Sequence, residues 1–199
     1  MDDNWQEIWE KLGRQETDDL AQLNGYGHCN ANHKEMTTTI IEALQIGPEE
    51  RVLEVGCGAG ALARYIAPHC RYAGIDLSTS LVARHREILG NEVKIASAND
   101  IPYHNGIFDK VFSFGVFHYF HDKNYVKEVL REMQRVGKGG STYIGDLPWT
   151  STRKSHLLFE SAWFQECKIT SGLYEPNARY RFNALIPDSV TMERIISRL

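Results

Sequence analysis

Apolar positions along the chain follow two spacings in turn, and this alternation predicts strands and helices in succession. Short, nearly continuous apolar runs typical of buried strands cover 51–55, 71–75, 92–96, 108–114 and 141–145, of which the fourth is expected to be central. Between these runs, apolar residues recur at helical spacing at 37–46, 61–67, 81–83 and 125–136. Five such alternations indicate βαβ units with right-handed crossovers. We therefore expect an α/β fold, a doubly wound and mostly parallel sheet with helices on both faces and a small N- and C-terminal cap.

The two ends of the chain depart from this rhythm, so we divide the sequence into three segments of one domain. Residues 1–36 predict a short helix and a mobile lid loop, and residues 37–146 the ligand-binding core. In the segment 147–199, a helix is expected over 157–164, a strand over 179–186 and a last short helix over 191–199. This segment either completes an edge of the sheet, covers the acceptor side of the ligand site, or does both.

Composition and charge narrow the class of protein. The 199 residues are 42% apolar, which is enough for a packed core and excludes a disordered chain. A net charge of −4 gives no overall basic field for nucleic acid or anionic lipid, and no apolar run approaches the roughly 18 residues of a membrane span. The acidic start lacks the pattern of a signal peptide, and the four cysteines are scattered without metal-ligand spacing. A reduced, cytoplasmic protein is the expectation.

A glycine-rich turn, Gly56 to Gly60, follows the first predicted strand. Such a turn at the carboxyl end of a parallel strand lets a ligand approach the backbone closely. Gly56, Gly58 and Ala61 fit a dinucleotide fingerprint, and Asp76 follows Gly56 by 20 residues, the spacing of a ribose-binding carboxylate. The glycines alone therefore leave the kind of nucleotide open.

Glu54 separates the alternatives, because it lies two residues before Gly56 where a pyrophosphate would approach. Like charges about 4 Å apart cost roughly 4 kcal/mol even at an effective dielectric near 20, so a carboxylate here disfavours a dinucleotide. A ligand that is cationic at this end is favoured instead. S-adenosylmethionine carries an ammonium and a sulfonium there, and its ribose offers two hydroxyls to Asp76.

Four ordered motifs resemble those of class I S-adenosylmethionine-dependent methyltransferases, and the likeness covers about residues 51–146. It is strongest to the small-molecule branch that includes the menaquinone and ubiquinone methyltransferases. The motifs are VLEVGCGAG at 52–60, GIDLS at 74–78, NDIPY at 99–103 leading into FDKVFS at 108–113, and LREM at 130–133 leading to GGS at 139–141.

The resemblance implies roles for individual residues. Glu54 and the backbone of Gly56 would hold the methionine end, Asp76 both ribose hydroxyls, and Leu77 would flank the adenine. Where the family usually has an acid for the adenine amino group, this chain has Ser97, and either Asn99 or Asp100 would substitute for it. The full set expected at the cofactor is Glu54, Gly56, Cys57, Gly58, Asp76, Leu77, Ser97, Ala98, Asn99, Ser113 and Tyr26.

His118 is the candidate base or acceptor contact, because it follows the fourth strand at the mouth of the expected site. The alternative is that it only packs beside the cofactor.

A polar loop contains Tyr26, His28, Cys29 and His33, and it either closes over the methionine carboxylate or is ordinary surface. These histidines match no metal-ligand spacing, and no metal is expected. Five C-terminal aromatic residues either line an acceptor pocket or belong to the core: Trp149, Phe159, Trp163, Phe164 and Tyr174.

The sequence therefore predicts a methyltransferase that moves a methyl group from S-adenosylmethionine to oxygen, nitrogen or carbon of a small molecule. The alternatives are a catalytically silent module that binds the same cofactor and, less favoured because of Glu54, a nicotinamide oxidoreductase. A nucleic-acid methyltransferase is disfavoured by the net charge and by Ser113-Phe114-Gly115-Val116, which stands where a base-clamping motif would follow the fourth strand.

Overall fold

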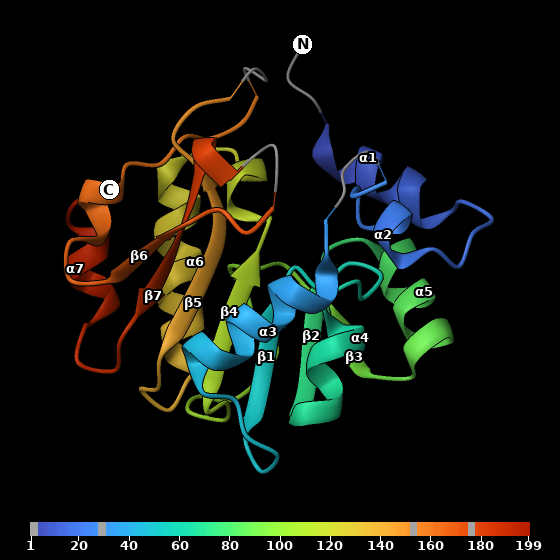
Figure 1. Ribbon diagram of the computed structural model, residues 1–199, viewed down its shortest axis with the longest axis horizontal. Helices are drawn as coiled ribbons and strands as arrows, with labels where there is room; N and C mark the ends of the chain where they lie inside the picture. The colour runs from blue at the N-terminus through green and yellow to red at the C-terminus, as the bar shows by residue number, and fades with distance from the viewer. Residues whose placement is uncertain (1–3, 28–30, 152–154, 175–177) are drawn as a thin grey trace.

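A single sheet organises the protein, as seen in a computed structural model that describes residues 4–27, 31–151, 155–174 and 178–199. Within these ranges seven strands lie in the order β3-β2-β1-β4-β5-β7-β6 (Figure 1). The first five are parallel, and β7 runs antiparallel to both of its neighbours. The strands are β1 (Arg51–Val55), β2 (Arg71–Asp76), β3 (Glu92–Ile95), β4 (Lys110–Phe114), β5 (Thr142–Pro148), β6 (Lys168–Ser171) and β7 (Arg181–Ile186).

Helices cover both faces of the sheet and one of its edges. On one face α3 and α4 pack through Met36, Ile40 and Ile66, and on the other α6 and α7 pack through residues such as Val129 and Ile195. Figure 1 shows α1 and α2 beyond the carboxyl ends of the parallel strands, above α5. The helices are α1 (Trp5–Gly13), α2 (Leu20–Leu23), α3 (His33–Leu44), α4 (Ala63–Ile66), α5 (Thr79–Leu89), α6 (Lys123–Val136) and α7 (Met192–Ile196), with short 3-10 turns η1 (Ala67–His69), η2 (Phe117–Tyr119), η3 (Ser161–Phe164) and η4 (Ala178–Tyr180).

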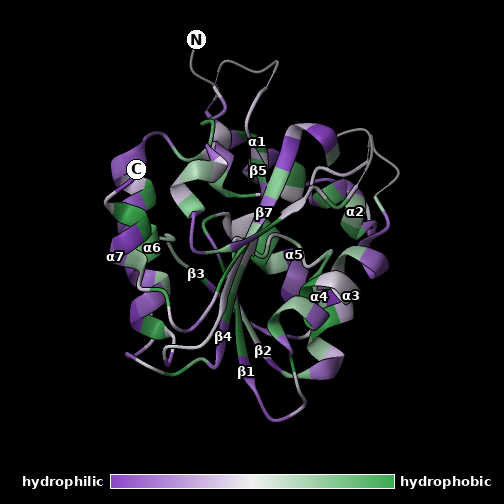
Figure 2. Ribbon diagram, turned by 60° about the vertical axis from the view of Figure 1, so that its left-hand side comes forward, coloured by the Kyte–Doolittle hydropathy of each residue, from purple (hydrophilic) through white to green (hydrophobic). Residues whose placement is uncertain are grey.

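Burial follows the sequence pattern that predicted the sheet. Strands β1, β4 and β5 are buried along nearly their whole length, as expected for parallel strands covered on both faces. Figure 2 shows the hydrophobic residues along these strands and on the helices beside them, with hydrophilic residues outward. None of the helices in the described part of the chain combines the length and apolar character needed to cross a bilayer.

Side-chain caps fix where the helices nearest the carboxyl edge begin. The Ser78 hydroxyl accepts from the Leu81 N–H at 3.2 Å, which makes Ser78 the N-cap of α5. The Asp122 carboxylate caps α6 in the same way, accepting from the Tyr125 N–H at 2.8 Å. These caps place both helix N-termini at the edge where the parallel strands end.

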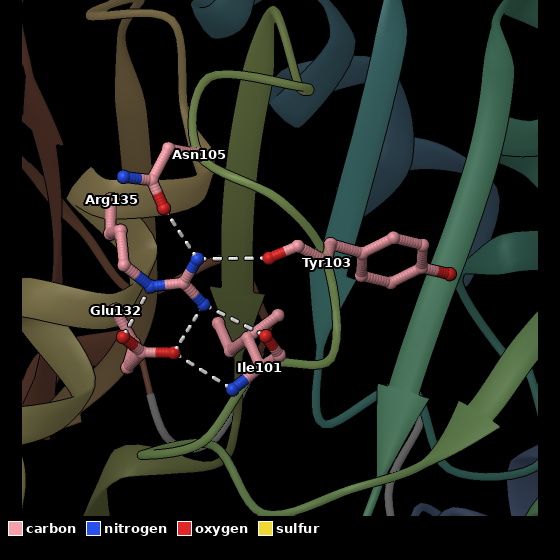
Figure 3. Close-up of polar contacts among 5 residues, drawn as sticks. All are labelled: Ile101, Tyr103, Asn105, Glu132 and Arg135. Carbon is pink, nitrogen blue, oxygen red and sulfur yellow. Dashed lines mark hydrogen bonds and ion pairs between the residues drawn. The ribbon is translucent and has the colours of Figure 1, made fainter.

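Arg135 of α6 holds the loop between β3 and β4 in place (Figure 3). Its guanidinium donates to the carbonyls of Ile101 (2.8 Å) and Tyr103 (2.9 Å) and to Asn105 Oδ1 (2.9 Å). Glu132, one turn earlier, pairs with Arg135 at 2.6 Å and accepts from the Ile101 N–H at 2.9 Å. The pair thereby satisfies backbone groups of a loop that lies outside the hydrogen-bonded strands of the sheet.

The predicted fold class, the doubly wound and mostly parallel α/β sheet, is confirmed, and all five predicted core strands are present with β4 in the centre. The predicted strand over 108–114 begins at Lys110, because Phe108 forms only an isolated bridge to Gly137. The expected β7 strand and α7 helix are also present, slightly shorter than predicted.

Two expectations about the ends of the chain are wrong, and one strand was missed. The helix expected over 157–164 is reduced to η3, because Phe159, Trp163 and Phe164 are all buried in the core rather than forming one helical stripe. Strand β6 was not predicted, since its residues are exposed and lack an apolar alternation. The N-terminal segment forms two helices rather than one, and Asp19 caps the second by accepting from the Ala21 N–H at 2.9 Å.

Candidate cofactor and acceptor site

A cavity of about 430 Å³ opens at the carboxyl ends of β1, β2 and β4, between the sheet edge and helices α1 and α2. This volume lies in the range of about 300–1,000 Å³ that small-molecule sites occupy. Among the described residues that line it, none is Lys or Arg. The lining comprises Trp5, Gln6, Trp9, Asn24, Tyr26, Gly56, Gly58, Ile75, Asp76, Leu77, Ser78, Leu81, Ala96, Ser97, Ala98, Phe114, Gly115, Val116, Tyr119, Phe120, His121 and Tyr125.

The glycine turn forms the floor of the cavity because its backbone needs conformations that other residues rarely adopt. Gly56 and Gly58 have φ values of 81° and 51°. A Cβ at Gly56 would lie 2.3 Å from Val116 Cγ2, and one at Gly58 would lie 2.4 Å from Asn24 Nδ2. Both positions therefore require glycine, for the backbone angle and for the space.

Asp76 ends β2 and presents its carboxylate to the cavity. The Gly58 N–H donates to Oδ2 at 2.8 Å and the Ser78 N–H to Oδ1 at 2.9 Å, so both oxygens are fixed in place. Removal from bulk water raises the pKa of this carboxyl, and the two backbone hydrogen bonds partly offset the effect. Each carboxylate oxygen retains a lone pair for a further donor, such as one hydroxyl of a ribose diol.

The two N-terminal helices are tied to the glycine turn and to α5. Asn24, directly after α2, accepts from the Ala59 N–H at 3.0 Å and donates to the Cys57 carbonyl at 3.4 Å. Glu10 of α1 accepts from the Thr79 N–H at 2.5 Å at the start of α5. The N-terminal segment therefore closes one side of the cavity.

Glu54 lies beneath the glycine turn and is only 2% exposed, so it is not among the lining residues. The Tyr72 hydroxyl donates to Glu54 Oε2 at 2.6 Å. Burial raises the pKa of Glu54 to about 8, against the lowering effect of the Tyr72 hydrogen bond. Without a cationic neighbour, Glu54 is therefore largely protonated at neutral pH, and its charge depends on what occupies the cavity.

The structure brings most of the predicted cofactor residues to one cavity: Tyr26, Gly56, Gly58, Asp76, Leu77, Ser97 and Ala98 all line it. Four others do not line it. Cys57 is buried and Ser113 donates to the Val55 carbonyl at 2.8 Å. Asn99 donates to Glu128 at 2.8 Å and accepts from Ser97 at 2.6 Å. The fourth is Glu54.

His118 also lies behind the cavity surface, 2% exposed, while its neighbour Tyr119 lines the cavity. The His118 ring packs against Tyr119 and His156 with ring centres 4.0 and 4.7 Å apart. Arg181 Nη1 lies 3.4 Å from His118 Nδ1, which makes Nδ1 the acceptor and places the ring proton on Nε2.

The predicted polar loop is described only in part, because His28 and Cys29 lie outside the described residues. Tyr26 packs edge-on against His33 and Tyr174, with ring centres 4.8 and 5.9 Å apart. In the described ranges no group of three or more His, Cys, Asp or Glu side chains is arranged to hold a metal ion. Of the C-terminal aromatics, Phe159, Trp163 and Phe164 belong to the core, and Trp149 is 49% exposed.

A buried ion pair that was not predicted lies next to the cavity. Asp146 near the end of β5 pairs with Arg181 at the start of β7, with Oδ2 and Nη1 2.7 Å apart, and Tyr174 donates to the same oxygen at 3.3 Å. Asp146 is 3% exposed and has φ +64°, at a register shift in the β5–β7 ladder. Burial raises the pKa of its carboxyl to about 7, although Arg181 acts in the opposite direction.

Only one of these unpredicted residues had a usable signal in the sequence. Asp146 directly follows the strand predicted over 141–145, and a polar residue at the end of a parallel strand faces the ligand edge of the sheet. Arg181, Asn24 and Tyr72 act through tertiary contacts that local spacing does not encode.

The sheet order, the glycine turn after β1 and the acid at the end of β2 define a Rossmann-like fold with a nucleotide-cofactor site at the carboxyl edge. Residues 53–144 match a family model described as a methyltransferase domain. The predicted resemblance to the class I, Rossmann-like S-adenosylmethionine-dependent methyltransferases is confirmed over these residues.

Known proteins extend the similarity. A sarcosine/dimethylglycine N-methyltransferase of Halorhodospira halochloris is 36% identical over 50% of this chain and 38% of its own length. The chloroplastic tocopherol O-methyltransferase of Arabidopsis thaliana is 30% identical over 64% of this chain and 42% of its own. The solved structure of the N-methyltransferase NodS from Bradyrhizobium japonicum, in complex with S-adenosyl-L-homocysteine, has a TM-score of 0.76 at 18% identity, covering 94% of this chain and all of that one. The matches to the two curated relatives span less than half of their lengths.

Proposed function

We propose that this protein is an S-adenosylmethionine-dependent methyltransferase that transfers a methyl group to a small-molecule acceptor. The observation that carries the proposal is the arrangement of Asp76 against the glycine turn, where two backbone N–H groups fix a carboxylate at the cavity wall. The relatives support the class of reaction, since their names include N- and O-methyltransferases of small molecules.

The residues present fit this cofactor. Asp76 would accept from the two ribose hydroxyls, Leu77 and Ala98 would flank the adenine, and Ser97 would face its polar edge. The backbone of Gly56 and Gly58 approaches the methionine part, with Glu54 beneath it. When bound, the cofactor supplies a methyl group activated by an adjacent sulfonium, so the protein's task is to align the acceptor and manage its proton.

The charges around the cavity favour a cationic ligand over a phosphorylated one. The described lining has no Lys or Arg to neutralise phosphate, and Asp76 and Glu54 both lie at the glycine turn. An ammonium near Glu54 lowers its pKa and draws the carboxylate form, which attracts the ligand in return. A pyrophosphate in the same place would meet the Asp76 carboxylate and no basic side chain from the described lining.

We propose that His118 acts on the acceptor side only indirectly, because it is buried and does not line the cavity. Its Nδ1 faces Arg181 rather than the cavity, so the ring helps to fix that guanidinium.

We also infer that nucleic acid is not the acceptor, given the net charge of −4 and the lack of basic residues in the described lining. The free state of Cys57, Cys70 and Cys167 supports the inferred cytoplasmic location.

Calorimetric titration with S-adenosylhomocysteine and with NADH tests the proposed cofactor. We expect micromolar or tighter binding of the first and none of the second. D76N should weaken the binding of S-adenosylhomocysteine by about tenfold or more, since a charge-assisted hydrogen bond is worth about 1.5–3 kcal/mol. D188N is the matched control, because Asp188 is exposed and bonds only to Ser141 among the described residues. Firm binding of NADH with no response to S-adenosylhomocysteine contradicts the proposal, and binding without turnover on any acceptor favours the silent module.

A further inference from the structure

The order of the strands fixes which part of the cofactor lies at which point of the cavity. Gly56 follows β1, Asp76 ends β2 and Ser97 follows β3, and these three strands are neighbours in the sheet. All three residues line the cavity. With the methionine end at Gly56 and the ribose at Asp76, the adenine extends to Ser97. The polar edge of the base is therefore recognised by side chains beside Ser97.

Tyr125, in the first turn of α6, lines the same cavity and was not predicted as a site residue. Its hydroxyl oxygen lies 2.7 Å from Ser97 Oγ. The Tyr125 ring packs against Phe120 and His121, with ring centres 4.9 and 4.7 Å apart, and both of these residues also line the cavity. Two hydroxyl groups from separate elements thus lie together at the base end of the cavity.

A chain of hydrogen bonds fixes the direction in which these hydroxyls donate. A carboxylate only accepts, so the amide atom of Asn99 that lies 2.8 Å from Glu128 Oε2 is its NH₂ group. The other amide atom, Asn99 Oδ1, accepts the Ser97 hydroxyl proton at 2.6 Å. Because its single proton is used in this way, Ser97 Oγ accepts from Tyr125 rather than donating to it. Both hydroxyl oxygens are left with acceptor capacity only.

We propose that Ser97 and Tyr125 form an acceptor pair for the 6-amino group of adenine. Asn99 and Glu128 are positioning residues, since they set the direction in which the pair donates, and Glu128 does so from the protein surface. This inference rests on the proposed function and concerns how the same site selects its cofactor. The amino group is a donor and matches two oxygens that only accept. A 6-oxo base presents an acceptor in the same place, so oxygen would face oxygen with no proton between them.

Calorimetric titration with S-adenosylhomocysteine and with S-inosylhomocysteine, its 6-oxo counterpart, measures this selectivity. We expect the adenine ligand to bind at least about tenfold more tightly, because opposed acceptors lose a hydrogen bond and leave buried oxygens unpaired. Equal binding of the two ligands overturns the inference. Binding of neither ligand overturns the proposed function instead.

Two variants test the residues separately through the ratio of the two dissociation constants. Y125F removes one acceptor and should lower the preference for adenine about threefold or more. E128A frees the Asn99 amide to turn and donate to Ser97, whose own proton can then meet a 6-oxo group. E128A should therefore lower the preference by a similar factor, mainly through tighter binding of S-inosylhomocysteine.

E42A is the matched control, because Glu42 is also an exposed glutamate but lies on α3, which packs on the other face of the sheet. It should leave the ratio unchanged. Since Glu128 is exposed, its removal should not prevent folding, and S97A replaces Y125F if that variant fails to fold. An unchanged ratio in either folded test variant overturns the inference, because structural damage alone weakens the binding of both ligands alike.

Discussion

Two buried carboxylates, Glu54 and Asp146, sit at the carboxyl edge of the sheet with raised pKa values for the same reason. Each has been removed from water, which penalises the charged form. They differ in their partners: among the described residues Glu54 accepts from the neutral Tyr72 hydroxyl alone, whereas Asp146 faces the guanidinium of Arg181. Glu54 is therefore the carboxyl whose charge responds most to a cationic ligand.

Cofactor binding should release about one proton from Glu54 at pH 7. Its pKa of about 8 keeps it protonated in the free protein, and the ammonium of a bound ligand favours the carboxylate. Titrations with S-adenosylhomocysteine in buffers of different ionisation enthalpy measure this release. E54Q should abolish it and weaken binding about tenfold, and equal proton release by both proteins would contradict the role given to Glu54.

At the scale of elements, the loop between β3 and β4 connects the core to the cofactor site. It carries Ser97 and Ala98 at the cavity, and the Arg135–Glu132 pair of α6 holds its later residues (Figure 3). This pair spans helix and loop, so its loss affects both folding and the position of the loop.

R135M should destabilise the protein by about 1.5–3 kcal/mol and weaken the binding of S-adenosylhomocysteine several-fold, because charge-assisted hydrogen bonds to loop carbonyls are lost. R131M is the matched control on the same helix, since the Arg131–Glu193 pair is more than half exposed and such pairs contribute about 0–1 kcal/mol. Urea unfolding and calorimetry measure the two effects. Equal destabilisation by both variants would show that the loop contacts of Arg135 contribute no more stability than the exposed ion pair of Arg131.

At the scale of the whole molecule, the raised carboxyl pKa values predict an unusual dependence of stability on pH. The usual pKa values are 4.5 for Glu54 and 3.8 for Asp146, and folding raises them to about 8 and 7. Between these values the native state holds protons that the unfolded chain has released. The stability that each group gives is therefore full below its usual pKa and lost as pH rises through its folded pKa.

The free energy of unfolding of the ligand-free protein should accordingly fall from about pH 6.5 to pH 8, by on the order of 1 kcal/mol per pH unit for each group that remains protonated. Below pH 6.5 the lowered pKa values of the buried His33 and His85 act in the opposite direction, because these rings must lose their proton on folding. Urea unfolding at several pH values measures this slope. E54Q should reduce it, because glutamine does not titrate. Stability that rises across this range would contradict the pKa assignments.

The sequence predicted those parts of the whole molecule that local patterns determine. The strands, the glycine turn and Asp76 follow from apolar spacing and motif spacing, and the structure brings Gly56, Gly58 and Asp76 to one cavity. The Asp146–Arg181 pair escaped prediction because it depends on pairing between β5 and an antiparallel β7, which joins residues 35 positions apart. The exposed strand β6 was not predicted for a related reason, because its pairing with β7, and not the burial of its side chains, holds it in the sheet.

A crystal structure with S-adenosylhomocysteine tests the central claim most directly. The account predicts that both ribose hydroxyls donate to the Asp76 carboxylate at about 2.7 Å, with the amino acid end of the ligand over Gly56 and Gly58. A ligand bound outside this cavity, or one whose ribose leaves Asp76 without a contact, would contradict it.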